Sequence, residues 1–540
     1  MRIHPKSKLD LESVRRALAE LLALGKDVEA IELVLGLLEQ LRDKNTQLEL
    51  ELMRLLRRHV GKTSERVSPE QLRLVLDQLD AGSESAASES EKVADTTLPP
   101  PDAKLPEDKP KSKGHGRRPL PAHLPRVVVS HPVPAQERAC SVCGAERVCI
   151  GHERSEVIEF IPASFRVELH EREKLACRVC EEGVTTAPLS EKVIEKGRPG
   201  PGLLAHVVTS KYADHIPLNR LSKIYAREGV HLAVSTLADW VAAVADSLAP
   251  LAERTRELVL ASHLVQADDT GLKVLDDRAP GGSKRGHLWC YVGDAKWTSF
   301  VYTPDWRKEG PQSFLAERRG WLQADAYKGY DGLFSRPGAT AVEVGCWSHG
   351  RRGFVELFQG GDVRSAVLLE KVQRLYAVER EANEAGDDHD ARRLRRERCS
   401  RPVIEEIGRW CAATYNQEPP KSALAKAIGY LINQWEALMR FLEDGRIPLD
   451  NTLCERILRI VAIGRKNYLF AGSDTGAERA ATIYTMAGTC ALNGVQPLAY
   501  FTDVLRKLET ERFPLSRIDE LLPPNWVKTA PASALVRPSR

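Results

Sequence analysis

The sequence predicts a multidomain protein built around an α/β core, and three observations lead to that prediction. The chain has 540 residues, more than one hydrophobic core usually holds. Strand-like runs dominate residues 260–347, whereas residues 198–255 and 354–443 read as helix. Two Cys-x-x-Cys pairs occupy a separate segment, residues 126–195. Apolar residues make up 42% of the chain and charged residues 28%, so much of it should fold as globular protein.

The first predicted element is an N-terminal helical region, residues 9–66. Apolar residues in it recur at alternating intervals of three and four, with one polar residue at an a position: Ile31, Val34, Leu38, Leu41, Asn45, Leu48, Leu52 and Leu55. This narrow a/d seam predicts a coiled coil through which the chain forms a homo-oligomer. The alternative is an amphipathic helix packed on its own domain.

Residues 80–125 are predicted to be a disordered linker with a basic end. The net charge of the chain is only +3 and names no partner, but residues 111–128 carry five bases and no acid. Such a segment is either a solvated linker or an arm that lies along a polyanion. Arg117 and Arg118 are its candidate DNA contacts.

Residues 126–195 form a predicted zinc-binding domain. Its four candidate ligands come in two pairs, Cys140 with Cys143 and Cys177 with Cys180. Four thiolates close a tetrahedral, structural Zn²⁺ site, whereas a redox centre needs only one such pair.

Residues 198–255 fit a helix-turn-helix. One helix ends at Gly229, and a second helix begins with Ser235 as its expected N-cap. Ser235, Thr236 and Asp239 would lie near the end that reads DNA. Many helical hairpins bind nothing, but the neighbouring zinc module and basic arm favour DNA binding.

Residues 260–490 are predicted to be the core, with a helical insertion at 354–443 and a helical tail at 491–540. Its predicted elements are strands at 264–268, 287–292 and 298–302, a helix at 311–319, and strands at 321–325 and 341–344. Three strands, a helix, a strand and further α/β structure is the order of an RNase H-like sheet.

The core supplies a candidate set of acids. The sequences Val-Gln-Ala-Asp268 and Leu-Gln-Ala-Asp325 repeat one pattern, in which each aspartate ends an apolar strand. With Glu455 from a later helix, they could hold two Mg²⁺ ions for phosphodiester chemistry. Strand-end aspartates are also common turn formers, and Asp269 could replace Asp268 as the ligand.

Cationic residues surround Glu455 and are either DNA contacts or helix salt bridges: Arg456, Arg459, Arg465 and Lys466. Asp450 is either a helix N-cap or a ligand. His349, with Arg351 and Arg352, either faces phosphate or caps a strand. The Arg392–Arg401 cluster reads as a solvated helix face.

Several motifs resemble the insertion-sequence-66 family of DDE-type transposases over nearly the whole chain. They are Gly61-Lys-Thr-Ser-Glu-Arg66, Gly116-Arg-Arg-Pro-Leu-Pro-Ala-His-Leu-Pro125, the four-cysteine module, Gln266-Ala-Asp-Asp-Thr270, Gln323-Ala-Asp-Ala-Tyr327, Gly345-Cys-Trp-Ser-His349, the block from Asp450 to Ser473, and Leu492-Asn-Gly-Val-Gln-Pro497. Two departures stand out. The family usually has Asp-Glu-Thr where this chain has Asp268-Asp269-Thr270, and Ala and Lys where it has Gly350 and Gly353.

The resemblance implies that Asp268, Asp325 and Glu455 are the catalytic acids of a DNA transposase. It also implies binding to terminal inverted repeats of a bacterial mobile element and to target DNA, together with accessory proteins of the same element. We expect a cytoplasmic, nucleoid-associated protein, because no apolar run reaches the roughly 18–20 residues that span a membrane. The alternatives are a non-catalytic DNA-binding repressor and an RNase H-like nuclease without strand transfer.

Overall fold

The computed structural model divides the chain into two compact units. One contains Leu248–Asn493, and the other contains Ile216–Ser247 together with Gly494–Arg540. The residues that the structure describes are 11–27, 30–31, 33–36, short stretches between 165 and 194, 199–510, 513–531 and 534–535. All three candidate acids lie in the first unit.

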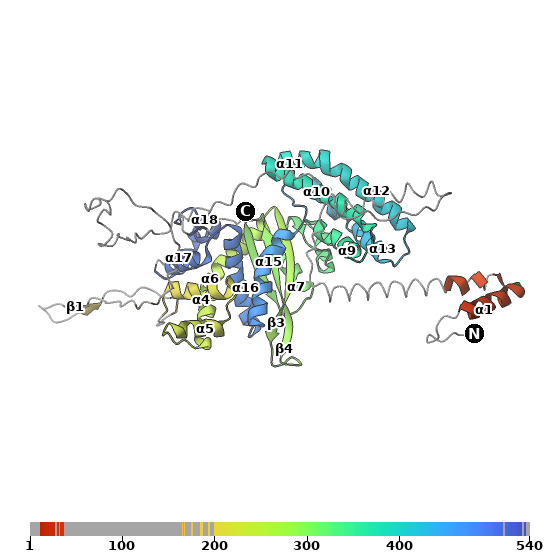
Figure 1. Ribbon diagram of the computed structural model, residues 1–540. Coiled ribbons are helices and arrows are strands. Elements are labelled where there is room, and N and C mark those ends of the chain that lie inside the picture. The colour runs from red at the N-terminus through yellow and green to blue at the C-terminus, as the bar shows by residue number, and fades with distance from the viewer. Residues whose placement is uncertain are drawn as a thin grey trace, which may run out of the picture. The chain divides into compact units, whose positions relative to one another are not determined.

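The first unit is built on a mixed sheet that contains β3 and β4 (Figure 1). Its five strands lie in the order β5-β4-β3-β6-β7. The strands are β3 (Leu264–Leu275), β4 (Ser283–Gly293), β5 (Trp297–Thr303), β6 (Gly320–Gln323) and β7 (Ala341–Val344). β4 is antiparallel to β3 and β5, whereas β6 is parallel to both β3 and β7. The helix α7 (Glu309–Phe314) separates β5 from β6, so the predicted order of strands and helix is confirmed.

β3 is longer than the sequence suggested. Residues 264–267 are buried, but from Thr270 onward buried and more exposed positions alternate. Pairing with β4 continues to Leu275, which lies opposite Ser283. The expectation that Asp268 ends its strand is therefore wrong. The alternation of Leu272 and Val274 with less buried neighbours extends the hairpin beyond Asp268.

The helix α16 (Asp474–Leu492) covers the outer edge of β5. Thr485 Oγ1 accepts a hydrogen bond from Phe300 N at 2.9 Å, and Thr489 Oγ1 accepts one from Thr298 N at 3.2 Å. The spacing matches, because residues four apart on a helix and two apart on a strand share a face. The edge strand thus has backbone donors satisfied by a helix, which protects it from pairing with another chain.

The region of the predicted insertion is a helical bundle, and its buried apolar core also includes Val344 on β7. Its main helices are α9 (Trp347–Gln359), α10 (Ser365–Ala385), α11 (His389–Arg395), α12 (Arg401–Gln417), α13 (Ala423–Asn433) and α14 (Trp435–Met439). The core joins Phe354 on α9, Leu369 on α10, Ile407 on α12 and Ile428 on α13.

The sequence predicts that the Arg392–Arg401 cluster is a solvated helix face. In the structure, one arginine of this cluster is buried. Arg396 is completely buried in η3 (Arg396–Ser400), a π-helical turn. It makes two hydrogen bonds to Glu379, at 2.7 and 2.8 Å, and also donates to the carbonyls of Phe441 and Asp444. A buried guanidinium is tolerated because each of its three nitrogens donates to an acceptor.

The two departures from the family pattern near His349 have a packing explanation. Gly350 and Gly353 lie on α9 and face α13. A Cβ added to Gly350 would come within 3.0 Å of Leu431, and one added to Gly353 within 3.2 Å of Ala427. Both glycines therefore permit a close approach of two helices that larger side chains would push apart.

Two helices lie where the sequence predicts a helix-turn-helix. α5 (Leu218–Arg227) is followed by Gly229 with φ of +80°, and α6 (Val234–Ala261) begins beyond it. The prediction that Ser235 caps the second helix is wrong, because Ser235 lies inside its first turn and Leu237 N bonds to Ala233 O. Ser235 and Asp239 are exposed, and Thr236 is half-buried.

The C-terminal part of the second unit is helical, as predicted. α17 (Pro497–Thr510) is followed by η5 (Leu515–Leu521) and α18 (Pro523–Trp526). Tyr500 OH donates to Leu521 O at 2.8 Å, and Trp526 Nε1 donates to Asp503 Oδ2 at 2.8 Å. These polar contacts, one buried and one partly buried, fix the last turns against α17.

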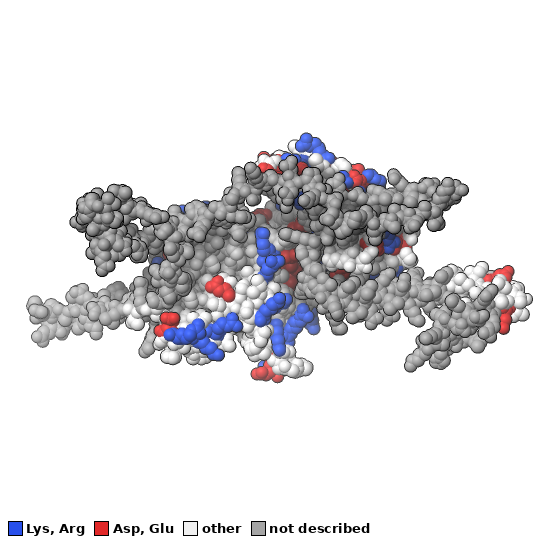
Figure 2. Space-filling view, viewed as in Figure 1, with Lys and Arg blue, Asp and Glu red and all other residues white. Residues whose placement is uncertain are grey.

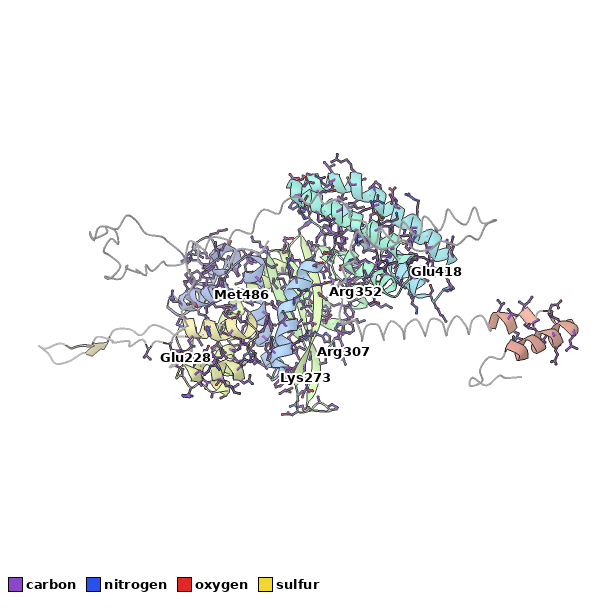
Figure 3. The ribbon with its side chains drawn as sticks, viewed as in Figure 1. Glu228, Lys273, Arg307, Arg352, Glu418 and Met486 are labelled. Atoms are coloured by element: carbon purple, nitrogen blue, oxygen red, sulfur yellow. The ribbon has the colours of Figure 1, made fainter. Side chains whose placement is uncertain are left out.

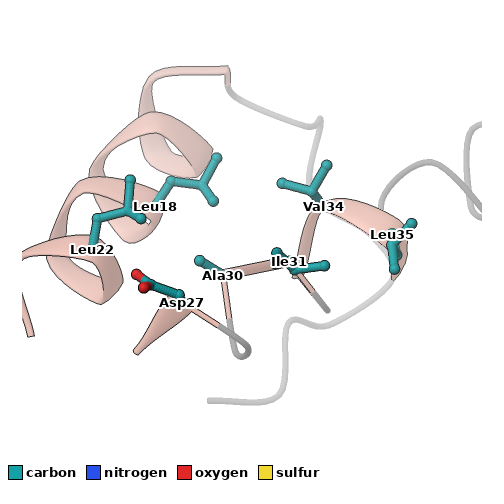
Figure 4. A pocket seen from close by; sticks show the side chains of 7 residues that line it. All are labelled: Leu18, Leu22, Asp27, Ala30, Ile31, Val34 and Leu35. Atoms are coloured by element: carbon teal, nitrogen blue, oxygen red, sulfur yellow. The ribbon is translucent and has the colours of Figure 1, made fainter. Parts of the chain in front are cut away.

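The described N-terminal residues form α1 (Leu11–Ala23) and a helical stretch between residues 30 and 36. Leu18 and Leu22 on α1 face Ala30 and Ile31 across an apolar hollow of about 380 Å³ (Figure 4). Ile31 is 58% exposed although it begins the predicted seam. The rest of the seam, from Leu38 to Leu55, lies outside the described residues, so the coiled coil stays a prediction.

The four candidate zinc cysteines and the basic arm with Arg117 and Arg118 also lie outside the described residues. Two short antiparallel strands, β1 (Lys174–Ala176) and β2 (Val184–Thr186), flank Cys177 and Cys180 in the chain. Within the described part of the chain, every helix is too short or too polar to cross a membrane.

Candidate active site

Asp268 lies in the middle of β3, at the centre of the sheet. Burial, the largest cause, together with the nearby negative charges of Asp325, Glu455 and Asp269, raises the pKa of its carboxyl to about 7. A backbone hydrogen bond from Asp269 N, at 2.8 Å, opposes the rise. Such a carboxyl is costly to ionise unless a cation joins it.

Asp325 follows β6, two residues beyond the last strand position. Because Gln266 pairs with Gln323 across the parallel strands, Asp268 and Asp325 each lie two residues beyond that pair, at equivalent positions along the two segments. Burial raises the pKa of Asp325, whereas the positive charges of His349 and Arg352 and a hydrogen bond from Tyr327 N lower it.

Glu455 comes from the first turn of α15 (Thr452–Tyr468). Its Oε1 lies 3.8 Å from His349 Nε2 on α9. The helix is fixed at its start by buried Asn451, whose Nδ2 donates to Ala267 O at 2.9 Å. That bond ties the helix to the residue before Asp268, so the strand and the helix present their acids together.

Cys346 belongs to the same surroundings. Its Sγ and the ligand atoms of His349 and Glu455 lie within 4.8 Å of one another. Burial raises the pKa of the Cys346 thiol to about 12, so the thiol stays protonated. It accepts a hydrogen bond from Asn451 N at 3.3 Å and therefore helps to position α15.

The two glutamines of the repeated tetrapeptide are the residues that sequence reasoning missed. Gln266 Nε2 donates to Gln323 Oε1 at 2.7 Å and to Asp450 O at 3.0 Å. Gln323 Nε2 donates to Gly345 O at 3.1 Å and to Pro448 O at 2.9 Å. The pair thus fixes both the start of the insertion and the segment that leads into α15. The repeated sequence Gln-Ala-Asp was the signal from which these glutamines could have been identified.

Asp269 and Asp450, the two further acids considered as ligands, have both carboxylate oxygens engaged. Asp269 contacts His287 Nδ1 at 2.5 Å and accepts from Trp306 Nε1 at 3.1 Å. Asp450 accepts from Thr452 N at 3.0 Å and from Tyr376 OH at 2.7 Å. These contacts favour Asp268 over Asp269 and give Asp450 a structural role at the start of α15.

The candidate DNA-contacting cations divide into two kinds. Arg456, Arg459 and Lys466 are exposed on α15. Arg465 is half-buried, and its guanidinium donates to Thr270 Oγ1 at 2.6 Å and to Gly271 O. Arg465 therefore braces α15 against β3, and its contact with DNA stays a prediction.

An open hollow of about 790 Å³ lies beside this brace, between the hairpin and the end of α15. Its lining includes five cations: Lys273, Lys284, Arg285, Arg465 and Lys466. Figure 2 shows Lys and Arg side chains gathered on this face, near the position that Figure 3 labels Lys273. One of the cations, Lys284, is neutralised by Asp276 and Asp474.

The chain was compared with protein-family models. The model described as transposase IS66 family matches residues 196–479, which includes all three acids. The chain belongs to the IS66 transposase family. Further models of the family match elsewhere: the zinc-finger binding domain of transposase IS66 at residues 137–181, transposase C of IS166 homeodomain at 47–129, and the IS66 C-terminal element at 485–523.

Relatives of this IS66 family chain span nearly its whole length. The uncharacterized protein y4hP of Sinorhizobium fredii (strain NBRC 101917 / NGR234) is 33% identical over 518 residues, covering 91% of this chain and 90% of the relative. The uncharacterized protein y4qI of the same strain is 34% identical over 494 residues and covers 87% of each chain. The family domains support a transposase-type enzyme with DNA as its partner, and they suggest the use of metal ions.

Proposed function

We propose that this IS66 family chain is a DDE-type DNA transposase whose catalytic acids are Asp268, Asp325 and Glu455. One observation supports the proposal: Asp268 lies on a central strand, Asp325 just beyond the end of its parallel neighbour and Glu455 in the first turn of α15, and the charges of Asp325 and Glu455 act on Asp268. The strand order supports an RNase H-like core, since three antiparallel strands are followed by two that run parallel to the first.

The three carboxyls fit Mg²⁺, which prefers hard oxygen ligands. Burial and then their mutual repulsion raise the pKa of Asp268, and a divalent cation would relieve both costs of its charge. Bound Mg²⁺ would neutralise the scissile phosphate and activate the attacking oxygen for cleavage and strand transfer. The two glutamines and Asn451 would hold the acids in register while DNA enters.

The positive charges around the acids support a polyanionic substrate. Arg352 on α9 is exposed and lowers the pKa of Asp325, so it would face the phosphate backbone near the site (Figure 3). Arg456, Arg459 and Lys466 would contact the DNA that leads away from the site. Ser235, Thr236 and Asp239 would read the terminal inverted repeats together with the arm that holds Arg117 and Arg118.

The remaining parts of the proposal concern assembly. Cys140, Cys143, Cys177 and Cys180 would hold structural Zn²⁺. The N-terminal seam would pair protomers so that two element ends are held together, with accessory proteins of the same element as further partners. The exposure of Ile31 at the start of the seam supports pairing, because an apolar side chain gains by burial against a second helix.

The test is single-turnover cleavage and strand transfer on duplex DNA that carries the flanking element ends, with Mg²⁺. We expect Glu455→Gln to reduce cleavage by more than about 100-fold. The matched control is Glu478→Gln, an exposed glutamate on α16, which should cut like wild type. A repressor would bind the ends without cutting. A simple nuclease would cut without end sequences and would not join strands.

A further inference from the structure

The loop between β5 and α7 carries a tryptophan that is left largely open. Trp306 is 52% exposed, and the adjacent Arg307 and Lys308 are exposed as well (Figure 3 labels Arg307). An exposed indole leaves a large apolar surface in water, which is unfavourable unless it meets a partner. Asp305 and Glu309 share the loop with these cations, and Arg307 Nε lies 3.4 Å from Asp305 Oδ2, so Lys308 is the cation that favours a negatively charged partner.

Trp306 is nevertheless held in one position. Its ring stacks on Tyr327 with 4.7 Å between ring centroids and an interplanar angle of 17°, and it also stacks on His287 at 5.7 Å and 16°. Its Nε1 donates to Asp269 Oδ1 at 3.1 Å, and Tyr327 OH donates to Trp306 O at 2.9 Å. The indole is therefore preorganised, so binding a partner costs little side-chain entropy.

Both supports of Trp306 adjoin catalytic acids. Asp269 follows Asp268 directly on β3, and Tyr327 N–H donates to the carboxylate of Asp325. A group that contacts the open part of the indole would thus sit beside the acids. On the proposed function, that group belongs to the DNA whose phosphate is being cut.

We infer that Trp306 is a positioning residue that contacts an unpaired nucleobase next to the scissile phosphate. An aromatic ring contacts any base, because every base has a π-face, whereas bases inside a duplex are already stacked. Lys308 would contact a phosphate of the same nucleotides. A protein partner fits less well, because the neighbours of Trp306 in the loop are charged instead of apolar. The inference rests on the proposed function, since it assumes DNA at the acids.

The first experiment is photo-cross-linking of the full chain carrying Glu455→Gln to element-end DNA with 5-iodouracil at positions around the cleavage site. We expect a cross-link at Trp306, mapped by peptide mass spectrometry. The second is single-turnover cleavage by Trp306→Ala on fully paired ends and on ends with unpaired bases at the same positions. Loss of base stacking, about 1–3 kcal/mol, should slow cleavage of paired ends roughly 5- to 150-fold. Ends that are already unpaired should be cut within about 3-fold of wild type.

Two variants separate contact with the base from indirect effects. Trp306→Phe keeps an aromatic face but loses the hydrogen bond to Asp269, and it should retain most of the wild-type rate. Tyr415→Ala removes an aromatic residue that is 44% exposed on α12 in the helical insertion, and it should have no effect. If Trp306→Phe is as slow as Trp306→Ala, or if unpaired ends give no rescue, the inference is overturned. A wild-type chain that cross-links at Trp306 but never cuts overturns only the proposed function, and one that neither cross-links nor cuts overturns both.

Discussion

Replacing Asp268 by asparagine should stabilise the metal-free protein while it abolishes cleavage. In the folded chain the pKa of Asp268 rises from its ordinary value of 3.8 to about 7. Each pKa unit corresponds to about 1.4 kcal/mol, so ionising this carboxyl costs the folded state about 4 kcal/mol relative to the unfolded chain. Asparagine keeps the oxygen that accepts from Asp269 N but carries no charge.

The sign of the pH dependence follows from the raised pKa. Below pH 4 the carboxyl is protonated in both states and costs nothing. Between about pH 4 and pH 7 the folded state keeps a proton that the unfolded chain has released, so stability falls as the pH rises through this window. Above pH 7 the full cost is present, and Asp268→Asn should then exceed wild type by up to about 4 kcal/mol.

Thermal unfolding in EDTA at pH 5 and pH 8 measures this difference, followed by the fluorescence of buried Trp289 and Trp347. For a unit of this size, a gain of about 4 kcal/mol corresponds to roughly 8–16 °C in the midpoint at pH 8, with a smaller gain at pH 5. Added Mg²⁺ should raise the wild-type midpoint more than that of the variant. The control is Asp277→Asn, an exposed aspartate in the hairpin turn, which should shift the midpoint at neither pH. An Asp268→Asn midpoint at or below wild type at pH 8 would refute the reasoning.

Four further predictions address other parts of the molecule. Gln323→Leu leaves the carbonyls of Gly345 and Pro448 without their donor, so we expect a lower thermal midpoint. The Mg²⁺ concentration needed for half-maximal cleavage should rise roughly 10- to 100-fold. An unchanged Mg²⁺ titration would count against a positioning role for Gln323. Arg396→Met should destabilise by about 1–3 kcal/mol in chemical denaturation because the carbonyls of Phe441 and Asp444 lose a donor and Glu379 keeps only its bond to Arg392, and adding Glu379→Gln should recover part of the loss. If the double variant is no more stable than the single one, the ion pair is not the cause. Metal analysis should find one Zn²⁺ per chain and less in Cys143→Ser, whereas a wild-type value well below one would exclude the four-thiolate site. Arg459→Ala should reduce the slope of log affinity for DNA against log salt by about 1, and an unchanged slope would mean that Arg459 does not contact phosphate.

Local patterns in the sequence were enough to predict the order of strands and helices in the core. Alternation and apolar runs mark strands because each strand buries one or both faces, and this depends mainly on neighbouring residues. The same reasoning misplaced the end of β3, since pairing with β4 decides how far the strand continues past Asp268. It also misplaced the cap of α6, because the residue at which a helix begins depends on the turn before it.

The candidate acids could be picked out from the sequence, but the residues that hold them in place could not. Gln266 and Gln323 look like ordinary polar residues until the parallel register places them opposite each other. Arg396 reads as one more arginine on a charged helix, and its burial depends on acceptors far along the chain, such as Phe441 O. Long-range partners of this kind leave no local pattern, so only the repeated tetrapeptide gave any hint.

Hydrogen bonds join the two ends of the helical insertion, and they limit how far a change in its length can alter the positions of the acids. Trp347 N donates to Leu449 O at 3.2 Å, and Asn451 N donates to Cys346 Sγ at 3.3 Å, so the chain leaves the core and returns to it at one place. The insertion between these points packs around a buried apolar core that also includes Val344 on β7. Because α9 and α10 contact Glu455 and Asp450, only the helices beyond them can lengthen or shorten during evolution without moving Glu455 relative to Asp268.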